Sequence, residues 1–170
     1  MRDERIQRFL AMTGPELARA LRQGHPIEPT ALDDSRYRGI SLGLPRLIEA
    51  LTWKTFEKTF HRDPSSGRLR GWNVRLEQTG WHEEPTPKRR RGQPFTFGHY
   101  LVREGHPLIL DYGSRRNFRL DPTRLVRDPL VAVDEGSVDW LLGRSDLAGG
   151  LKTPSYFLLE RLGPLDFVPR

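Results

Sequence analysis

The alternation of hydrophobic and polar positions is clearest in the stretch 95–112, near the middle of the chain. In its first half, one face of an extended strand carries Phe95, Phe97, His99 and Leu101. In its second half, one face carries Leu108, Leu110 and Tyr112. A segment with one Gly and one Pro, residues 104–107, separates the two halves. Period-2 alternation on both sides of such a turn predicts a β-hairpin.

Weaker alternation predicts further strands at 37–43, 68–78, 130–134, 138–142 and 154–162. In the stretch 68–78, Trp72, Val74 and Leu76 share one face, and polar residues share the other. This pattern is typical of a sheet with one face in water. Strands in this number, joined mostly by short turns, favour a closed antiparallel barrel, because an open sheet leaves unpaired edges. We therefore expect a mainly β fold with a barrel of about seven to eight strands.

Helical spacing predicts helices at both sides of the first strand. Thr13 and Glu16 have the spacing of a capping box, and Gly24 can end the helix that they begin. A shorter helix is expected around residues 4–12, and another after the first strand, from Pro45 to Phe60. The chain is thereby divided into an N-terminal helical segment and linker (1–34), a barrel domain (35–162) and a C-terminal tail (163–170).

The composition fits one cytoplasmic domain. A chain of 170 residues, with 36% hydrophobic and 29% charged residues, can bury one core. No apolar run approaches the roughly 20 residues that span a bilayer, and the first ten residues contain no apolar signal segment. The absence of Cys excludes disulfides, thiolate catalysis and Cys-ligated metals.

The net charge of +6 raises the question of nucleic-acid binding. Much of the excess lies in one run, Lys88, Arg89, Arg90 and Arg91. Because Pro and Gly flank this run, it is interpreted as a solvated surface loop, and nucleic acid is the less favoured partner. Binding of a nucleic acid or an acidic partner through residues 88–91 remains an alternative.

Three segments resemble the lipocalin-like barrels of the bacterial GXWXG type. They are YRGISLGLP at 37–45, the helix expected up to Phe60, and SYFLLER at 155–161. The order of elements is similar over residues 35–162, although no Trp stands between the glycines of the first strand. The resemblance implies a barrel that binds a small apolar ligand. It supplies no catalytic residue.

A barrel of about eight strands is wide enough to hold one small molecule, so a cavity inside it is the expected site. Its candidate ligand-binding residues are Trp72, Phe97, His99, Tyr100, Leu101, Trp140 and Tyr156. Arg38, Asn73 and Asn117 are further candidates to anchor a carboxylate or carbonyl group. The leading hypothesis is therefore the binding of a small, largely apolar molecule, with no cofactor.

The alternative is a cofactor-free enzyme of the isomerase, cyclase or lyase type in the same cavity. His99 would be its acid or base, assisted by Asp111 or Tyr112. A His–Asp pair across the hairpin depends on a strand register that the sequence leaves open. The chain contains no GxSxG, P-loop, GxGxxG or HExxH motif, and its histidines have no metal-ligand spacing, so no metal is expected.

Overall fold

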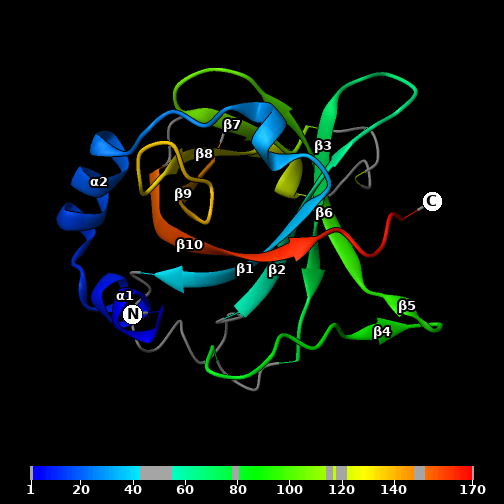
Figure 1. Cartoon of the computed structure of the whole chain (residues 1–170), viewed down its shortest axis with the longest axis horizontal. Helices are drawn as coiled ribbons and strands as arrows, with labels where there is room; N and C mark the ends of the chain where they lie inside the picture. Colours follow the sequence, from blue (N-terminus) through cyan, green and yellow to red (C-terminus); the bar gives the residue numbers. More distant parts are fainter. Residues whose placement is uncertain are drawn as a thin grey trace.

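The computed structural model describes residues 2–42, 55–77, 81–113, 117, 122–147 and 152–169. Its main feature is a closed antiparallel barrel in the order β1-β10-β9-β8-β7-β6-β3-β2 (Figure 1). The barrel strands are β1 (Ser35–Leu42), β2 (Thr55–Arg62), β3 (Leu69–Arg75), β6 (Thr96–Arg103), β7 (Leu108–Asp111), β8 (Val126–Ala132), β9 (Trp140–Leu147) and β10 (Lys152–Pro164). The expected barrel is thus confirmed. Closure leaves no edge, since β1 pairs with both β2 and β10.

Strand register separates an inner and an outer face of the barrel wall. Tyr37 on β1 lies opposite Lys58 on β2, and Lys58 lies opposite Asn73 on β3. Residues of this face meet in one buried cluster inside the barrel. Its members are Ile27, Leu32, Tyr37, Phe60, Leu69, Tyr100, Leu108, Leu110, Tyr112, Leu130, Ala132, Leu141, Phe157 and Leu159. Because Ile27 and Leu32 precede the first strand, the linker closes one end of the barrel.

Two helices cover part of the outer wall. Helix α1 (Arg2–Ala11) and helix α2 (Gly14–Gln23) lie on one side of the barrel in Figure 1. The Glu16 carboxylate accepts a hydrogen bond from the Thr13 backbone N–H at 2.7 Å, as the expected capping box requires. A second apolar cluster joins the helices to the wall, and it contains Ile6, Phe9, Leu17, Leu21, Ile40, Leu42, Val131, Leu142, Tyr156 and Leu158.

Short 3₁₀ helices and a coil complete the chain outside the barrel strands and the two helices. A 3₁₀ helix, η1 (Pro29–Leu32), precedes β1, and a second one, η2 (Pro122–Leu125), precedes β8. The strand β10 continues two residues beyond the expected barrel boundary, to Pro164, and residues 165–169 follow as coil. Among the described residues, no helix has the length and apolar character needed to cross a bilayer.

Strand β2 and two short strands at the basic run correct two expectations about secondary structure. The helix expected from Pro45 to Phe60 is wrong from Thr55 onward, where the chain is strand β2; residues 43–54 lie outside the described residues. The basic run is not a plain loop. Strands β4 (Arg89–Arg90) and β5 (Gln93–Pro94) pair as a hairpin, which projects from the side of the molecule opposite the helices (Figure 1).

The central hairpin of β6 and β7 forms as expected, with one irregularity. Leu101 lies opposite Asp111, and Val102 lies opposite Leu110. The register between β3 and β6 shifts by one residue where Gly98 has a φ of +53°. A bulge with glycine in this left-handed conformation inserts one residue and reverses the alternation on either side of it. The four residues expected on one face of β6 are therefore divided between two faces.

Candidate functional site

The inner wall carries a buried polar cluster centred on Lys58. The side chain of Lys58 is 2% exposed and extends from the middle of β2. Its Nζ donates to Asn73 Oδ1 at 3.0 Å and to the hydroxyl of Tyr112, and it lies 3.5 Å from Asp128 Oδ2. The Tyr112 hydroxyl in turn donates to Asp128 at 3.0 Å. The three donors of the ammonium group therefore have three partners inside the barrel.

Four aromatic rings surround the same ammonium group. Their centroids lie 5.0–5.6 Å from Lys58 Nζ, and they belong to Phe56, Tyr100, Tyr112 and Phe157. The negative faces of aromatic rings attract a cation at such distances. A charged lysine, which is rarely buried without partners, is thus held by one carboxylate, two neutral oxygens and four rings.

Glycines explain how these rings fit inside a narrow barrel. A Cβ atom at Gly39 would lie 2.3 Å from the ring of Phe56, and one at Gly143 would lie 2.2 Å from the ring of Phe157. Each glycine lies directly opposite its aromatic residue on the paired strand. The rings consequently lie flat against glycine backbone, and they line the wall around Lys58.

Burial dominates the electrostatics of the cluster. Desolvation lowers the pKa of Lys58, and the nearby Asp128 carboxylate opposes this effect. Desolvation also raises the pKa of Asp128, opposed by Lys58. The pKa of Tyr112 is raised by burial and by the charge of Asp128. Both members of the ion pair are therefore shifted toward their neutral forms, whereas the Tyr112 hydroxyl holds its proton more tightly.

The structure places only some of the expected ligand-binding residues inside the barrel. Tyr100 is a member of the inner cluster, and the bulge places Phe97 opposite the inward-facing Asn73. The other residues lie on the outer face, which corrects the expectation that they wall an interior cavity. They are Trp72, His99, Leu101, Trp140 and Tyr156.

The outer positions have physical causes. Trp72 lies opposite Thr59 on β2, and its ring packs 6.3 Å from that of His99, centroid to centroid. Trp140 and Tyr156 pack in the cluster beneath the helices. The outer wall is apolar because helices and chain ends cover it, so its hydrophobic alternation resembles that of an inner face.

The expected pair of His99 and Asp111 is replaced by other partners. Asp111 forms ion pairs with Arg103 and with Arg127, the latter at 2.9 Å. The backbone of His99 is held by Asn117, which accepts from its N–H and donates to its carbonyl group, both at 2.7 Å. Asn117 therefore fixes the bulged strand, and Tyr112 alone of the three proposed catalytic residues lies inside the barrel.

Lys58 and Asp128 were missed by reasoning from the sequence. In the segment TFEKTFHR, Phe56, Lys58 and Phe60 share one face at a period of two, but Phe56 and Phe60 also match the spacing of a helix. A lysine between two phenylalanines of one strand face was the available signal. Asp128 precedes Pro129, and this dipeptide is more often found in turns than in a barrel strand.

Within the described residues, no group of three or more His, Asp or Glu side chains is arranged to hold a metal ion. Comparison of the chain with protein-family models, curated proteins and solved structures found no match. The site is therefore interpreted from its own geometry.

Proposed function

We propose that the barrel interior binds a small, largely apolar molecule that presents a carbonyl or carboxylate oxygen to the Lys58 cluster. The single observation that carries this proposal is a lysine, a tyrosine hydroxyl and a carboxylate brought together inside a closed barrel. An incoming acceptor oxygen can take a hydrogen bond from the ammonium group or from the Tyr112 hydroxyl by replacing one of their protein partners. The aromatic rings supply apolar contact for the rest of the molecule.

The position of the cluster along the barrel supports entry from one end. The linker residues Ile27 and Leu32 pack with the inner core at the other end. Lys58 lies between Phe60, which belongs to that core, and Phe56, which is only partly buried. We propose that the barrel is of the lipocalin-like GXWXG type, a resemblance that implies a small apolar ligand in the interior.

Acid–base catalysis in the same interior is the second candidate. It is favoured by the opposite pKa shifts of Lys58 and Asp128, which bring a base and an acid closer in proton affinity. His99 lies on the outer face, so Lys58 and Asp128 replace it in this role. Binding remains the first proposal, because the three partners of Lys58 hold it as a donor, and a donor suits an acceptor oxygen better than the role of a base.

Native mass spectrometry of freshly purified protein, compared with its denatured mass, tests the binding proposal. We expect a reproducible extra mass that is lost on denaturation. For protein that carries no extra mass, titration calorimetry with decanoate, an apolar chain with one carboxylate, is expected to show saturable binding. Absence of both the extra mass and decanoate binding would contradict the proposal.

Variants locate the binding. Tyr112→Phe keeps the ring and removes the hydroxyl, and Lys58→Met removes the charge. Each variant is expected to weaken decanoate binding at least about tenfold, because each loses one hydrogen bond to the carboxylate. His99→Ala is the matched control, since His99 lies on the outer face. Circular dichroism shows whether each variant folds. Equal binding by folded Tyr112→Phe and Lys58→Met would place decanoate elsewhere.

A further inference from the structure

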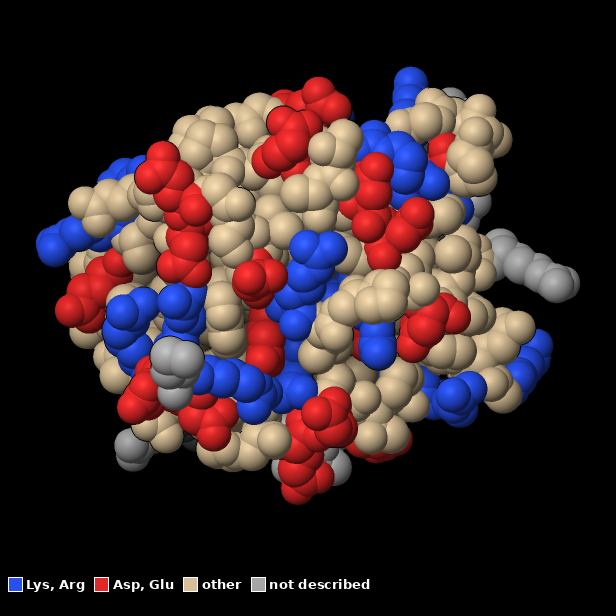
Figure 2. Space-filling view, in the orientation of Figure 1, with Lys and Arg blue, Asp and Glu red and all other residues tan. Residues whose placement is uncertain are grey.

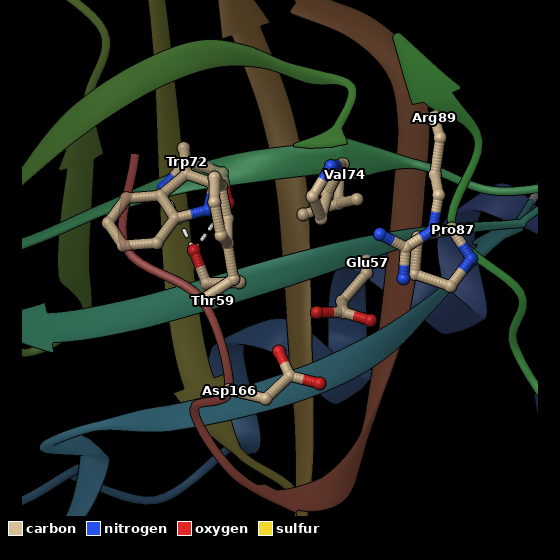
Figure 3. A pocket seen from close by; sticks show the side chains of 9 residues that line it. Glu57, Thr59, Trp72, Val74, Pro87, Arg89 and Asp166 are labelled. Atoms are coloured by element: carbon tan, nitrogen blue, oxygen red, sulfur yellow. Dashed lines mark hydrogen bonds between the residues drawn. The ribbon is translucent and has the colours of Figure 1, made fainter. Parts of the chain in front are cut away.

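A pocket on the outer wall lies apart from the Lys58 cluster. Its volume is about 210 Å³, and it opens between the barrel strands β2 and β3, the β4–β5 hairpin and the C-terminal coil (Figure 3). The residues that line it are Glu57, Thr59, Trp72, Val74, Pro87, Arg89, Pro94, Asp166 and Phe167. It therefore brings together parts of the chain that are far apart in sequence.

Glu57 is the polar group at the base of this pocket. Its side chain is 3% exposed, and Figure 3 shows its carboxylate directed toward that of Asp166. Among the described residues, Glu57 Oε2 has no hydrogen-bond partner, and it forms an ion pair with Arg36 Nη1 at 3.5 Å. Arg36 also lies 3.6 Å from Asp166 and thus ties the C-terminal coil to the pocket. A buried carboxylate oxygen without a hydrogen bond has room for an N–H donor from a ligand.

The other walls and the size select the kind of ligand. Val74, Pro87 and Pro94 give the pocket flat apolar sides. Its volume, about 210 Å³, is below the roughly 300–1,000 Å³ of pockets that enclose a drug-sized molecule. It can accept one heteroaromatic ring system and leave the remainder of the ligand at the rim.

The rim on the hairpin side is basic. Arg89 lines the pocket and is exposed, whereas the exposed Arg90 and Arg91 line a separate hollow of the hairpin. Among the described residues, none of the three is in an ion pair, whereas the neighbouring Lys88 lies 3.3 Å from Glu77. In Figure 2, basic and acidic side chains alternate over the barrel, while basic side chains gather at the end that holds the hairpin. Arginines without acidic partners are suited to bind phosphate.

We propose that this outer pocket binds a nucleotide, with an N–H edge of the nucleobase on Glu57 and the phosphate on Arg89 of the β4–β5 hairpin. The carboxylate oxygens accept from the base edge, as carboxylates do in base recognition. The prolines and Val74 pack against the ring. Arg89 on the hairpin supplies the positive charge that a phosphate requires and that the acidic floor of the pocket lacks. The same chemistry is offered by a free nucleotide and by the 5′ end of a single-stranded nucleic acid.

Titration calorimetry at low salt with GMP, guanosine and ribose 5-phosphate tests both halves of the proposal. We expect saturable GMP binding, with guanosine and ribose 5-phosphate each at least tenfold weaker. A hexaribonucleotide with a 5′-phosphoguanosine distinguishes the sources, since tighter binding than GMP assigns the site to nucleic acid and weaker binding assigns it to a free nucleotide. Absence of GMP binding up to millimolar concentration would overturn the proposal, as would ribose 5-phosphate that binds as tightly as GMP.

Matched variants assign the contacts. Glu57→Gln keeps the shape of the side chain and is expected to weaken GMP at least tenfold, whereas Glu77→Gln leaves it unchanged. Arg89→Ala is expected to weaken GMP binding and to flatten its salt dependence, but to leave guanosine binding unaffected. Arg68→Ala, which removes an exposed arginine outside the pocket, controls for net charge. GMP affinity equal to the wild type in folded Glu57→Gln would refute the assignment. Tyr112→Phe should not affect GMP, so the two proposals can fail separately.

Discussion

Glu57 is the single residue with the clearest expected effect of pH. Burial raises the pKa of this carboxyl to about 7, in spite of Arg36 nearby and assisted by Asp166. The folded state then binds a proton more tightly than the unfolded chain. Its stabilising contribution is complete below the unfolded-state pKa, near 4.5, and is lost as the pH rises through about 7.

Comparison of the wild type with Glu57→Gln measures this effect. A pKa difference of this size corresponds to about 3 kcal/mol, so the free energy of unfolding of the wild type should fall by about that much relative to the variant between pH 4 and 8. Urea unfolding at several pH values gives both curves. Glu77→Gln, at an exposed carboxylate, is the control. Parallel curves for the wild type and Glu57→Gln would show that the carboxyl ionises normally.

Lys58 and Asp128 are expected to be energetically coupled. Lys58→Met leaves a buried carboxylate without its cation, which typically costs about 3–5 kcal/mol. Asp128→Asn leaves the ammonium group with neutral partners only, Asn73 and Tyr112. The double variant removes both charges, so its loss in unfolding free energy should be smaller than the sum of the single losses. Urea unfolding of the four proteins closes this cycle, and additive losses would show that the two charges do not interact.

At the scale of the strands, glycine positions on the inner wall determine where the rings can lie. A Cβ atom at Gly71 would lie 2.0 Å from the carbonyl oxygen of Thr59 and 2.5 Å from the ring of Tyr100. Backbone of a paired strand cannot move aside as a flexible side chain can. Gly71→Ala is therefore expected to cost at least about 2 kcal/mol, the scale of overpacking in a core.

Gly14→Ala is the matched control for Gly71→Ala. No atom lies within 4 Å of a Cβ at Gly14, which begins helix α2, and alanine favours helix. It should leave the stability unchanged or raise it by up to about 1 kcal/mol. Thermal midpoints of the two variants provide the comparison. A Gly71→Ala protein as stable as Gly14→Ala would mean that β2 and β3 can separate locally.

The elements also show how far the sequence could predict the structure. The hairpin of β6 and β7, the capping box at Thr13 and the barrel follow from local alternation and turn residues. Which face of β3 and β6 points into the barrel does not follow from local alternation. Both faces of these strands are covered, so Trp72 on the outer wall has the same pattern as a core residue. The bulge at Gly98 then reverses the alternation that placed Phe97 and His99 together.

The polar cluster could not be found for a related reason. Its members Lys58, Asn73, Tyr112 and Asp128 come from four strands, and only the closed barrel brings them together. Asn73 and Tyr112 are candidates from the sequence, whereas Lys58 and Asp128 each resemble a surface position. Their partners depend on register across the whole sheet, which is set by long-range pairing rather than by neighbours in the chain.

At the scale of the whole molecule, the helices and the barrel share one apolar cluster. Ile6 and Leu17 are fully buried against the outer wall, and Arg2 and Arg5 form ion pairs with Glu160 and Asp134. Helices of ten residues are rarely stable alone in water. The N-terminal segment therefore depends on the barrel for its structure, and the barrel depends on it to cover an apolar face.

This mutual dependence predicts one cooperative unfolding transition. In urea, circular dichroism at 222 nm follows the helices and sheet, and fluorescence follows the four tryptophans of the chain, among them Trp72 and Trp140 on different parts of the outer wall. The two curves should have the same midpoint. Leu17→Ala should shift both curves together, by about 2–5 kcal/mol, whereas Leu10→Ala, at a 40% exposed residue, should shift neither. Separate midpoints, or a curve with two steps, would show that the helices detach before the barrel unfolds.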